Sequence, residues 1–432
     1  MRAGDAPSQS ACDPTNSDGC WYATFADQAV EQSTYTPQSP KVQNGQSTLA
    51  AGTSTLNVTI TSVVMTKAFV TFSASFNDAN PDFSQVSGQI IDATTIRFQR
   101  AKSVGAPAIT IEWYVAEFNR GVTVQRNSTT MTANTVNVPI SSVALAKSFP
   151  IVTYRKSGTG YGSDDFLRAK ITTSTNLQLS LFNITVFDGV AEWQVIEYTD
   201  ASVQTGDVTL NPGPSPPSDF SKMITIPTVD ETKAWLLFTY TSDNGTAFNI
   251  GPKMVRGLIM TPTTLVFDRN FTNAMLSLTW YLVVFTDTTS VQSWRVYFAT
   301  GQTQKDISIE CVDPTKTIVT AGGMYYRGGR TWYGSDDNPG VATVTLDLTT
   351  STNLRLVRGA SPNDADIGWY VVEFGTGCPV AGTFPDYILS ADGTFIQYRE
   401  ANIGQTGAGN NPTGIGTSPA CAWTSCSNGE TS

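Results

Sequence analysis

Apolar and polar residues alternate with a period of two along most of this chain. The segments "LNVTITSVV" (56–64) and "VNVPISSVA" (136–144) show the alternation clearly, and Gly, Pro, Asn and Asp interrupt it at short intervals. This pattern is typical of half-buried β-strands joined by turns, and no segment shows the 3.6-residue period of an amphipathic helix. The sequence therefore predicts an all-β fold built from short antiparallel strands.

One seven-residue stretch occurs four times, each time with a tryptophan at its second position. The copies are "EWYVAEF" (Glu112–Phe118), "EWQVIEY" (Glu192–Tyr198), "TWYLVVF" (Thr279–Phe285) and "GWYVVEF" (Gly368–Phe374). Their tryptophans are 80, 87 and 89 residues apart. Burying a large aromatic side chain in the middle of a strand contributes about 2–3 kcal/mol. We therefore interpret each copy as a core strand and not as a catalytic signature.

The glutamate near the end of this stretch is not constant. Glu117, Glu197 and Glu373 occupy the position in three copies, whereas the third copy along the chain has Val284. A carboxylate at a strand end can reach solvent or accept hydrogen bonds from a neighbouring turn. Because one copy lacks the carboxylate, we expect no catalytic role for it.

Two further features recur in the same order and with similar spacing. A lysine occurs upstream of each tryptophan, at Lys67, Lys147, Lys233 and Lys316. A Val-Gln pair opens each repeat, at Val42-Gln43, Val124-Gln125, Val203-Gln204 and Val291-Gln292. A repeat of this size accommodates six or seven strands and is too long for a propeller blade of about 40–50 residues. We therefore predict four tandem antiparallel β-sandwich modules.

We place the four repeats, called units one to four below, at 42–119, 120–200, 201–287 and 288–376. An irregular N-terminal arm (1–41) precedes them, and a Gly/Pro-rich C-terminal tail (377–432) follows, with short strands expected in "DYILSADGTFIQYRE". Because only a few residues join successive units, the joints should be stiff, and the units should form a rod or a compact array.

Charge and composition argue against some classes of function. The net charge is −10, and charged residues make up only 14% of the chain. An acidic chain has no electrostatic reason to bind nucleic acid or an anionic membrane surface. The sequence also contains no run of about 18 apolar residues, so we expect no membrane insertion.

The chain has six cysteines and no histidine. Without histidine or a CxxC pair, a zinc site is poorly supported, and we predict no metal site of this kind. We interpret the cysteines as three disulfides formed in an oxidising environment, with buried free thiols as the alternative. The expected pairs are Cys12–Cys20, Cys311–Cys378 and Cys421–Cys426.

The N-terminal sequence "MRAGDAPSQSACDP" lacks the apolar segment of a signal peptide. Either an export signal was removed before this numbering begins, or the protein reaches its site in another way, as virion proteins do. We expect a secreted, extracellular surface structure, with a virion as the alternative location.

Catalytic motifs are not found in this sequence. The lack of histidine excludes Ser-His-Asp and Cys-His mechanisms, and there is no GxSxG elbow, Walker loop or dinucleotide-binding fingerprint. A carboxylate pair of the glycosidase type is what remains, and no pair stands out among the 36 acidic residues. We therefore expect a protein that is not an enzyme and that needs no cofactor.

A Gly-rich loop in units two and four is the strongest candidate for a binding surface. It reads "TYRKSGTGYGSDDF" (153–166) and "YYRGGRTWYGSDDNPG" (325–340). Tyr, Trp and Arg are enriched at interface hot spots, so contact with a partner subunit or a glycan is one interpretation, and a turn that packs the modules is the other. Its paired aspartates could hold Ca²⁺, although their spacing matches no EF-hand. The candidate residues are Tyr154, Arg155, Tyr161, Asp164, Asp165, Tyr326, Arg327, Arg330, Trp332, Tyr333, Asp336 and Asp337.

The repeated lysine and glutamate resemble the crosslinking residues of Gram-positive surface domains, in which an isopeptide bond joins Lys to Asn or Asp beside a buried acid. Here the lysine lies in a turn just before a strand, where Lys normally extends to water. Val284 also removes the acid from unit three. A solvated lysine is therefore the alternative to a crosslink.

The order of Val-Gln, Thr-Lys-aromatic and Trp-x-Val-x-Glu-aromatic resembles tandem modules of bacterial surface proteins and phage virion proteins, over about 42–376. The closing strand and "FPIV" (149–152) are also similar to H-type lectin domains. These resemblances imply an exposed structural or adhesive protein.

From these features we expect a non-enzymatic extracellular structural protein, a subunit of a surface filament, appendage or sheath. Abutting repeats, disulfides and Ser/Thr-rich strands suit a durable assembly, in which exposed sheet edges pair between copies. A phage virion fibre or decoration protein and a glycan-binding adhesin are the alternatives. The expected partners are copies of this chain, other subunits of the same assembly, or surface glycans.

Overall fold

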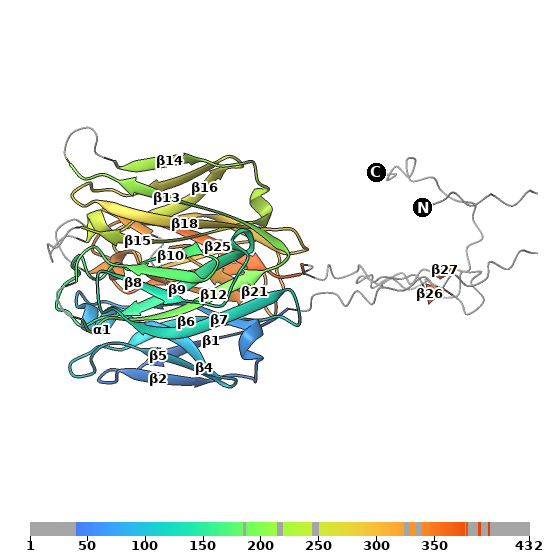
Figure 1. Ribbon diagram of the computed structural model, residues 1–432, viewed down its shortest axis with the longest axis horizontal. Coiled ribbons are helices and arrows are strands. Elements are labelled where there is room, and N and C mark those ends of the chain that lie inside the picture. The colour runs from blue at the N-terminus through green and yellow to red at the C-terminus, as the bar shows by residue number, and fades with distance from the viewer. Residues whose placement is uncertain are drawn as a thin grey trace, which may run out of the picture.

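The computed structural model describes residues 40–184, 187–213, 219–243, 250–323, 329–332, 338–375 and 377–378, together with the backbone of 388–389 and 396–397. Its regular structure is mostly β, which confirms the predicted all-β character, and its helical segments have only three or four residues. The strands lie side by side along the body (Figure 1). The helical segments are η1 (Met65–Lys67), α1 (Pro81–Ser84), η2 (Leu145–Lys147), η3 (Glu231–Lys233), η4 (Gly251–Lys253) and η5 (Pro339–Val341).

Unit one contains six strands in two antiparallel sheets. The sheet orders are β1-β6-β3 and β2-β5-β4, so the tryptophan strand β6 is central and the Val-Gln strand β1 is at an edge. Apolar side chains of the two sheets face each other, and the rings of Phe72 and Phe98 are 5.0 Å apart. The strands are β1 (Lys41–Leu49), β2 (Thr55–Thr59), β3 (Ala68–Ser75), β4 (Ser87–Asp92), β5 (Thr95–Gln99) and β6 (Ile109–Glu117).

The same two sheet orders recur in units two and three. The tryptophan strand is again central in its sheet, between the first and third strands of its unit. The strands of unit two are β7 (Val122–Thr130), β8 (Thr135–Pro139), β9 (Ser148–Arg155), β10 (Arg168–Thr173), β11 (Asn176–Ser180) and β12 (Val190–Tyr198). Those of unit three are β13 (Ala201–Leu210), β14 (Ser221–Thr225), β15 (Ala234–Ser242), β16 (Arg256–Thr261), β17 (Thr264–Asp268) and β18 (Leu276–Phe285).

Unit four departs from the pattern at its third strand, which is divided into two short strands that both pair with the tryptophan strand. Gly322 follows the first of them with a φ of +77°, a conformation that favours glycine. The strands are β19 (Ser290–Phe298), β20 (Gln304–Ser308), β21 (Thr317–Thr320), β22 (Gly329–Thr331), β23 (Val344–Thr350), β24 (Asn353–Arg358) and β25 (Ala365–Glu373). In the predicted tail, β26 (Ile388–Leu389) pairs with β27 (Ile396–Gln397).

Both faces of the tryptophan strand are buried, which confirms its interpretation as a core strand. On one face of β6, Trp113 and Val115 belong to the core between the two sheets of unit one. On the other face, Tyr114 and Phe118 contact units two and four. The four repeated tryptophans are only 5–7% exposed. The strand therefore serves two cores, one inside its own unit and one between units.

Successive units contact each other through a hydroxyl on the third strand. Thr153 Oγ1 in β9 accepts a hydrogen bond from the backbone N–H of Gly88 in β4 (3.0 Å). Thr239 Oγ1 in β15 accepts one in the same way from Ala169 in β10 (2.9 Å). The second sheet of one unit is thereby held against the first sheet of the next.

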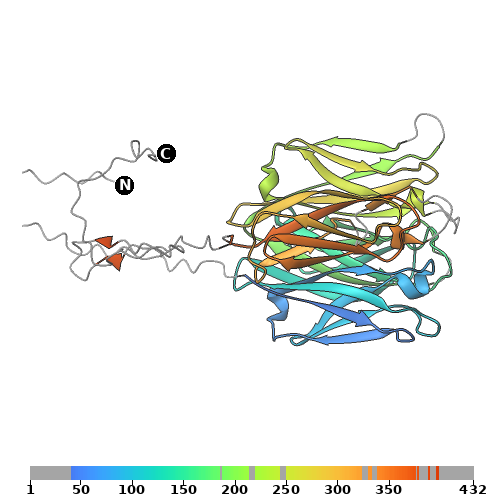
Figure 2. The same ribbon diagram turned by 180° about the vertical axis from the view of Figure 1, so that it is seen from behind.

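These contacts continue from unit four back to unit one. Ser73 Oγ in β3 accepts a hydrogen bond from the N–H of Leu346 in β23 (2.8 Å). Units three and four are joined by the hydroxyl of Tyr370, which donates to the carbonyl of Gly257 (3.3 Å). In Figure 1 unit one (blue) and unit three (yellow-green) lie on opposite sides of the body with unit two (green) in front, and Figure 2 shows unit four (orange) in front.

The final aromatic residue of each repeated stretch lies where the four units meet. Phe118, Tyr198, Phe285 and Phe374 are each at most 3% exposed. Around the circuit in that order, neighbouring ring centroids are 5.5, 5.3 and 6.1 Å apart, and Phe374 returns to Phe118 at 5.0 Å. The seven-residue stretch thus supplies the central aromatic cluster as well as the core of each unit.

The two ends of the body lie together. The N–H of Val42 donates to the carbonyl of Thr315 (2.6 Å), and a Cβ added at Gly375 would lie 3.7 Å from Cγ of Pro40. Both ends are at the same end of the body in Figure 1. The start of unit one therefore meets the end of unit four.

Candidate functional site

The tyrosines of the unit-two loop are buried and not exposed. Tyr154 and Tyr161 both have an exposed fraction of 0%. The hydroxyl of Tyr161 lies 2.8 Å from Ser84 Oγ of unit one, and its carbonyl accepts a hydrogen bond from Lys253 Nζ of unit three. These contacts favour the packing interpretation of this loop.

The charged residues of the same loop are paired within the protein. Arg155 lies 2.8 Å from Glu192, and Asp164 lies 2.9 Å from the ammonium of Lys156. Burial disfavours the charged form of Lys156, but its hydrogen bond to Asp164 and the nearby carboxylates raise its pKa overall. Asp165 accepts a hydrogen bond from the N–H of Gly162 (2.7 Å). A cation would therefore have to displace Lys156, and among the described residues no group of three or more Cys, Asp or Glu could hold a metal ion.

The unit-four candidates are placed only in part. Arg330 and Trp332 belong to the described residues. Outside them lie Tyr326, Arg327, Tyr333, Asp336 and Asp337.

Arg330 belongs to a charged cluster at the junction of units three and four. This cluster, called the Asp366 cluster, consists of Arg256 and Asp268 of unit three with Arg295, Arg330 and Asp366 of unit four. The carboxylate of Asp366 is 1% exposed and lies 2.5 Å from Arg256 and 2.7 Å from Arg295. Three guanidinium groups thus contact two carboxylates, and the buried pair of Arg256 and Asp366 connects the two units.

An exposed aromatic pair lies beside the Asp366 cluster. The rings of Tyr297 and Trp332 meet edge to face at 6.0 Å, and the Arg330 guanidinium lies 5.4 Å from the Trp332 ring. Tyr297 and Trp332 are 46% and 41% exposed. Two exposed aromatic rings thus lie beside a half-buried arginine, and Tyr, Trp and Arg are the residue types enriched at interface hot spots.

The sequence prediction missed Arg295, Tyr297 and Asp366. For Arg295 and Tyr297 the signal was present in β19, whose "SWRVYF" (293–298) occupies the phase of "NGQSTL" (44–49) and "TGDVTL" (205–210) in units one and three. A comparison between units, position by position, would have identified this aromatic and basic departure from a polar, glycine-containing pattern.

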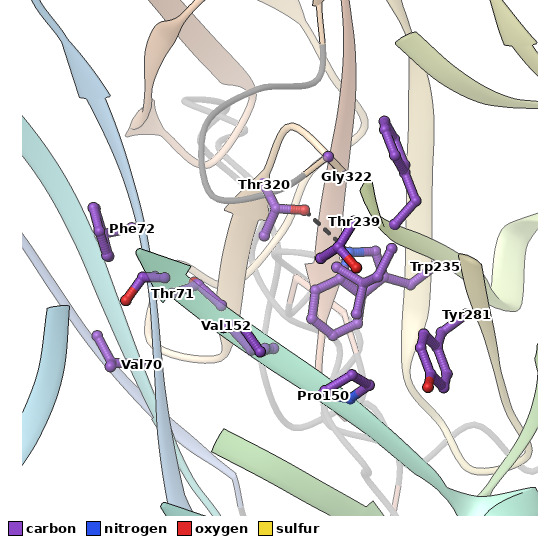
Figure 3. Close-up of a pocket in the computed structure, with 15 residues that line it drawn as sticks. Val70, Thr71, Phe72, Pro150, Val152, Trp235, Thr239, Tyr281, Thr320 and Gly322 are labelled. Carbon is purple, nitrogen blue, oxygen red and sulfur yellow. Dashed lines mark hydrogen bonds between the residues drawn. The ribbon is translucent and has the colours of Figure 1, made fainter. Parts of the chain in front are cut away.

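A small cavity lies where the third strands of all four units approach one another (Figure 3). Its volume is about 50 Å³, and Thr71, Val152, Trp235 and Thr320 are among the lining residues. Trp235 Nε1 donates to Thr320 Oγ1 across it (3.0 Å). A space of this size accommodates water but not an organic ligand, so we interpret it as a packing feature.

The predicted disulfide between Cys311 and Cys378 is present, with Sγ atoms 1.98 Å apart. It connects the region after β20 to the residues that follow β25. The other predicted pairs, Cys12–Cys20 and Cys421–Cys426, lie outside the described residues.

The repeated lysine holds the joint between successive units. Lys67 Nζ donates to the carbonyl of Asn119 (2.6 Å), and Lys147 Nζ donates to that of Ala201 (2.5 Å). In unit three, Lys233 Nζ donates to the carbonyls of Asp287 and Thr289. Because these acceptors are backbone carbonyls, the contacts favour a hydrogen-bonded joint over an isopeptide crosslink.

The repeated glutamate caps the turn before the third strand, which is one of the two roles considered for it from the sequence. Glu117 accepts a hydrogen bond from the N–H of Val64 (2.7 Å), and Glu197 from that of Ala144 (3.2 Å). Glu373 accepts one from the N–H of Asp313 (2.6 Å). In each case the carboxylate accepts a backbone hydrogen bond from its own unit.

Within the part of the chain that the structure describes, no helix is both long and apolar enough to span a membrane. A scan against protein-family models and a search of curated proteins found no match to this chain.

Proposed function

We propose that the two sheets of each unit form one β-sandwich module and that the four modules close into a ring. The facing apolar sides of the sheets support the sandwich, and the contact of Ser73 with Leu346 supports the closure. Each predicted unit contains a full set of strands, except that β1 begins one residue earlier, at Lys41. Of the two predicted arrangements, these contacts favour the compact array over the rod.

On this basis we propose that the chain is a non-enzymatic structural protein, a subunit of an extracellular filament, appendage or sheath. The observation that carries the proposal is the set of outer edge strands, β2, β8, β14 and β20, each of which pairs with a single neighbour among the described strands. In β14, Met223 is 72% exposed, and Lys222 is neutralised by Asp219 (2.8 Å). Such an edge can pair with a second copy.

The test is the assembly state of the full chain, measured by sedimentation velocity and electron microscopy. We expect concentration-dependent association, and we expect Met223→Lys to weaken it by placing an unpaired charge on the edge of β14. Val104→Lys, at a residue that is 88% exposed and outside every strand, is the matched control. Monodisperse single bodies at high concentration would contradict the proposal. Association that Met223→Lys leaves unchanged would exclude the β14 edge.

The predicted alternative, a virion fibre or decoration protein, would have the same structural role but in a virion. If the chain assembles into particles only when capsid or tail proteins are present, the virion is favoured. If the chain forms filaments by itself, a surface appendage is favoured.

A glycan-binding adhesin is the second candidate, favoured by the exposed ring pair of Tyr297 and Trp332. A glycan array tests it directly. We expect binding that Trp332→Ala removes, because the aromatic platform is lost. Absence of binding by the intact chain would count against the adhesin.

A further inference from the structure

One position of the repeat is aromatic in unit four only. The first strand of each unit places one residue opposite the repeated tryptophan: Gly45 opposite Trp113, Asn127 opposite Trp193, Gly206 opposite Trp280, and Trp294 opposite Trp369. In units one and three the tryptophan ring occupies the space above the glycine, since a Cβ at either position would lie 2.8 Å from it. Unit four instead has a second indole at this position, and Trp294 is 55% exposed.

Trp294 lines a groove between units three and four. The groove has a volume of about 670 Å³, within the range of small-molecule sites. Unit three contributes Met260, which is 43% exposed, and unit four contributes the buried Trp369. An exposed indole and an exposed thioether thus line the same groove at the junction of two units, and exposed apolar surface of this kind often marks a binding site.

The charged residues that line this groove are all acidic. They are Glu231, Glu310 and Glu373, and no lysine or arginine is among the described residues that line the groove. Burial raises the pKa of Glu373, whose carboxylate caps the turn at Asp313. Glu231 is half-buried and Glu310 is exposed.

Lys233, two residues after Glu231, and Lys316 are engaged elsewhere. Lys233 donates to the backbone carbonyls of Asp287 and Thr289, and Lys316 lies 3.3 Å from Asp313. The groove therefore combines an exposed indole with two carboxylates that no cation neutralises among the lining residues of the described chain.

We propose that this groove binds a small organic cation of the alkylammonium class. The face of an indole attracts an ammonium or trimethylammonium group through its quadrupole, and nearby carboxylates add Coulomb attraction. Charge complementarity selects a cation over an anion, and the apolar surface of Trp294 and Met260 suits its methyl or methylene groups. The inference does not depend on whether the chain assembles.

The probe is choline chloride, followed by ¹⁹F NMR of protein labelled with 5-fluorotryptophan. The resonance of Trp294 is identified by its absence in Trp294→Phe. We expect this resonance to shift saturably with choline at millimolar concentration, and the shift to weaken with added NaCl. The uncharged analogue 3,3-dimethyl-1-butanol should cause no comparable shift. A parallel titration with Nα-acetyl-lysine methylamide distinguishes a lysine side chain from a quaternary ammonium as the preferred source.

Charge variants complete the test. We expect Glu310→Gln and Glu231→Gln each to raise Kd by about two- to fivefold, because each removes one exposed charge interaction. Asp92→Asn, the same loss of charge at the end of β4 in unit one, should leave Kd unchanged. The proposal is overturned if choline shifts no Trp294 resonance, if the neutral analogue binds equally well, or if a neutral methyl glycoside binds in preference to both.

Discussion

At the scale of single residues, three buried arginines hold the loops of their units together. Arg100, Arg269 and Arg358 are at most 2% exposed. Each donates to four backbone carbonyls, so the guanidinium satisfies loop groups that would otherwise be buried without a donor. Desolvation lowers the pKa of Arg269 and Arg358 to about 10. Unit two has Leu181 at the equivalent position.

Replacing one of these arginines should therefore be costly. We expect Arg269→Met to lower the free energy of unfolding by about 3 kcal/mol or more, because several buried carbonyls lose their donor at once. Chemical denaturation measures the effect. Leu181→Met, the corresponding change in unit two, removes no hydrogen bond and should cost less than about 1.5 kcal/mol. Equal losses in the two variants would contradict this account.

The repeated indoles differ in whether their N–H has a partner. Trp113 donates to Ser47 and Trp193 to Thr129, each at 3.0 Å. In unit three the equivalent of these hydroxyl residues is Val208, and Trp280 Nε1 is buried with no hydrogen-bond partner in the part of the chain that the structure describes.

A hydroxyl placed at Val208 should correct this defect. We expect Val208→Thr to raise the free energy of unfolding by about 1 kcal/mol, because it supplies an acceptor of nearly the same size. The mirror change, Thr129→Val, should lower it by a similar amount. Thermal unfolding of both variants tests the pair, and a destabilising Val208→Thr would show that the hydroxyl does not reach the indole.

The Val-Gln pair shows how far sequence alone could go at this scale. Its repetition was visible, but its role was not: Gln43 both donates to and accepts from the backbone of Thr61. Unit three has Pro227 where Thr61 stands in unit one, so no N–H is available, and Gln204 Oε1 is buried with no hydrogen-bond partner among the described residues. A partner 18 residues away in the chain cannot be read from a dipeptide.

At the scale of elements, the junction between units four and one differs in charge from the others. Between units two and three, Asp207 is neutralised by Arg168 and Lys170 (2.8 and 2.6 Å). Between units four and one, Glu112 in β6 is faced by Gln46 in β1 and by Asp347 in β23. Burial and the negative charge of Asp347 raise the pKa of Glu112 to about 7, although the hydrogen bond from Gln46 acts to lower it.

This junction should make stability depend on pH. An acid with a raised pKa in the folded state binds protons more tightly there than in the unfolded chain, so stability falls as pH rises from about 4.5 to 7. After allowance for solvent screening, we expect a contribution of about 1–2 kcal/mol. Glu112→Gln should remove this part of the pH dependence in urea unfolding measured from pH 5 to 8. A variant with the same pH profile as the parent would contradict the assignment.

The strands themselves were predictable, whereas their surroundings were not. Alternation places Trp113 and Val115 on one face of β6, as the structure does. The same alternation was uninformative about Tyr154 and Tyr161, since residue type alone cannot distinguish an interface ring from one buried by a neighbouring unit. The divided third strand of unit four depends on the turn at Gly322, which the repeat pattern does not reveal.

At the scale of the whole molecule, the central aromatic cluster connects all four units. Phe374 contacts Phe118, Tyr198 and Phe285, which belong to the other three units. The units should therefore unfold together and not one at a time.

Truncation of this cluster tests that expectation. Phe374→Ala should lower the free energy of unfolding by about 3–5 kcal/mol and shift one common transition in differential scanning calorimetry. Phe182→Ala, at a residue that is 45% exposed, is the control and should have little effect. Separate transitions, with only one of them shifted, would show that the units are independent.

The adjacency of Pro40 and Gly375 has a mechanical consequence. In a linear chain of domains, a force applied to the two ends passes through every domain in series. Here the same force enters at two neighbouring points and first loads the contact of Val42 with Thr315 and the junction between units four and one. Under tension the junction between units four and one should therefore separate first. Units two and three should carry no load until that junction has opened.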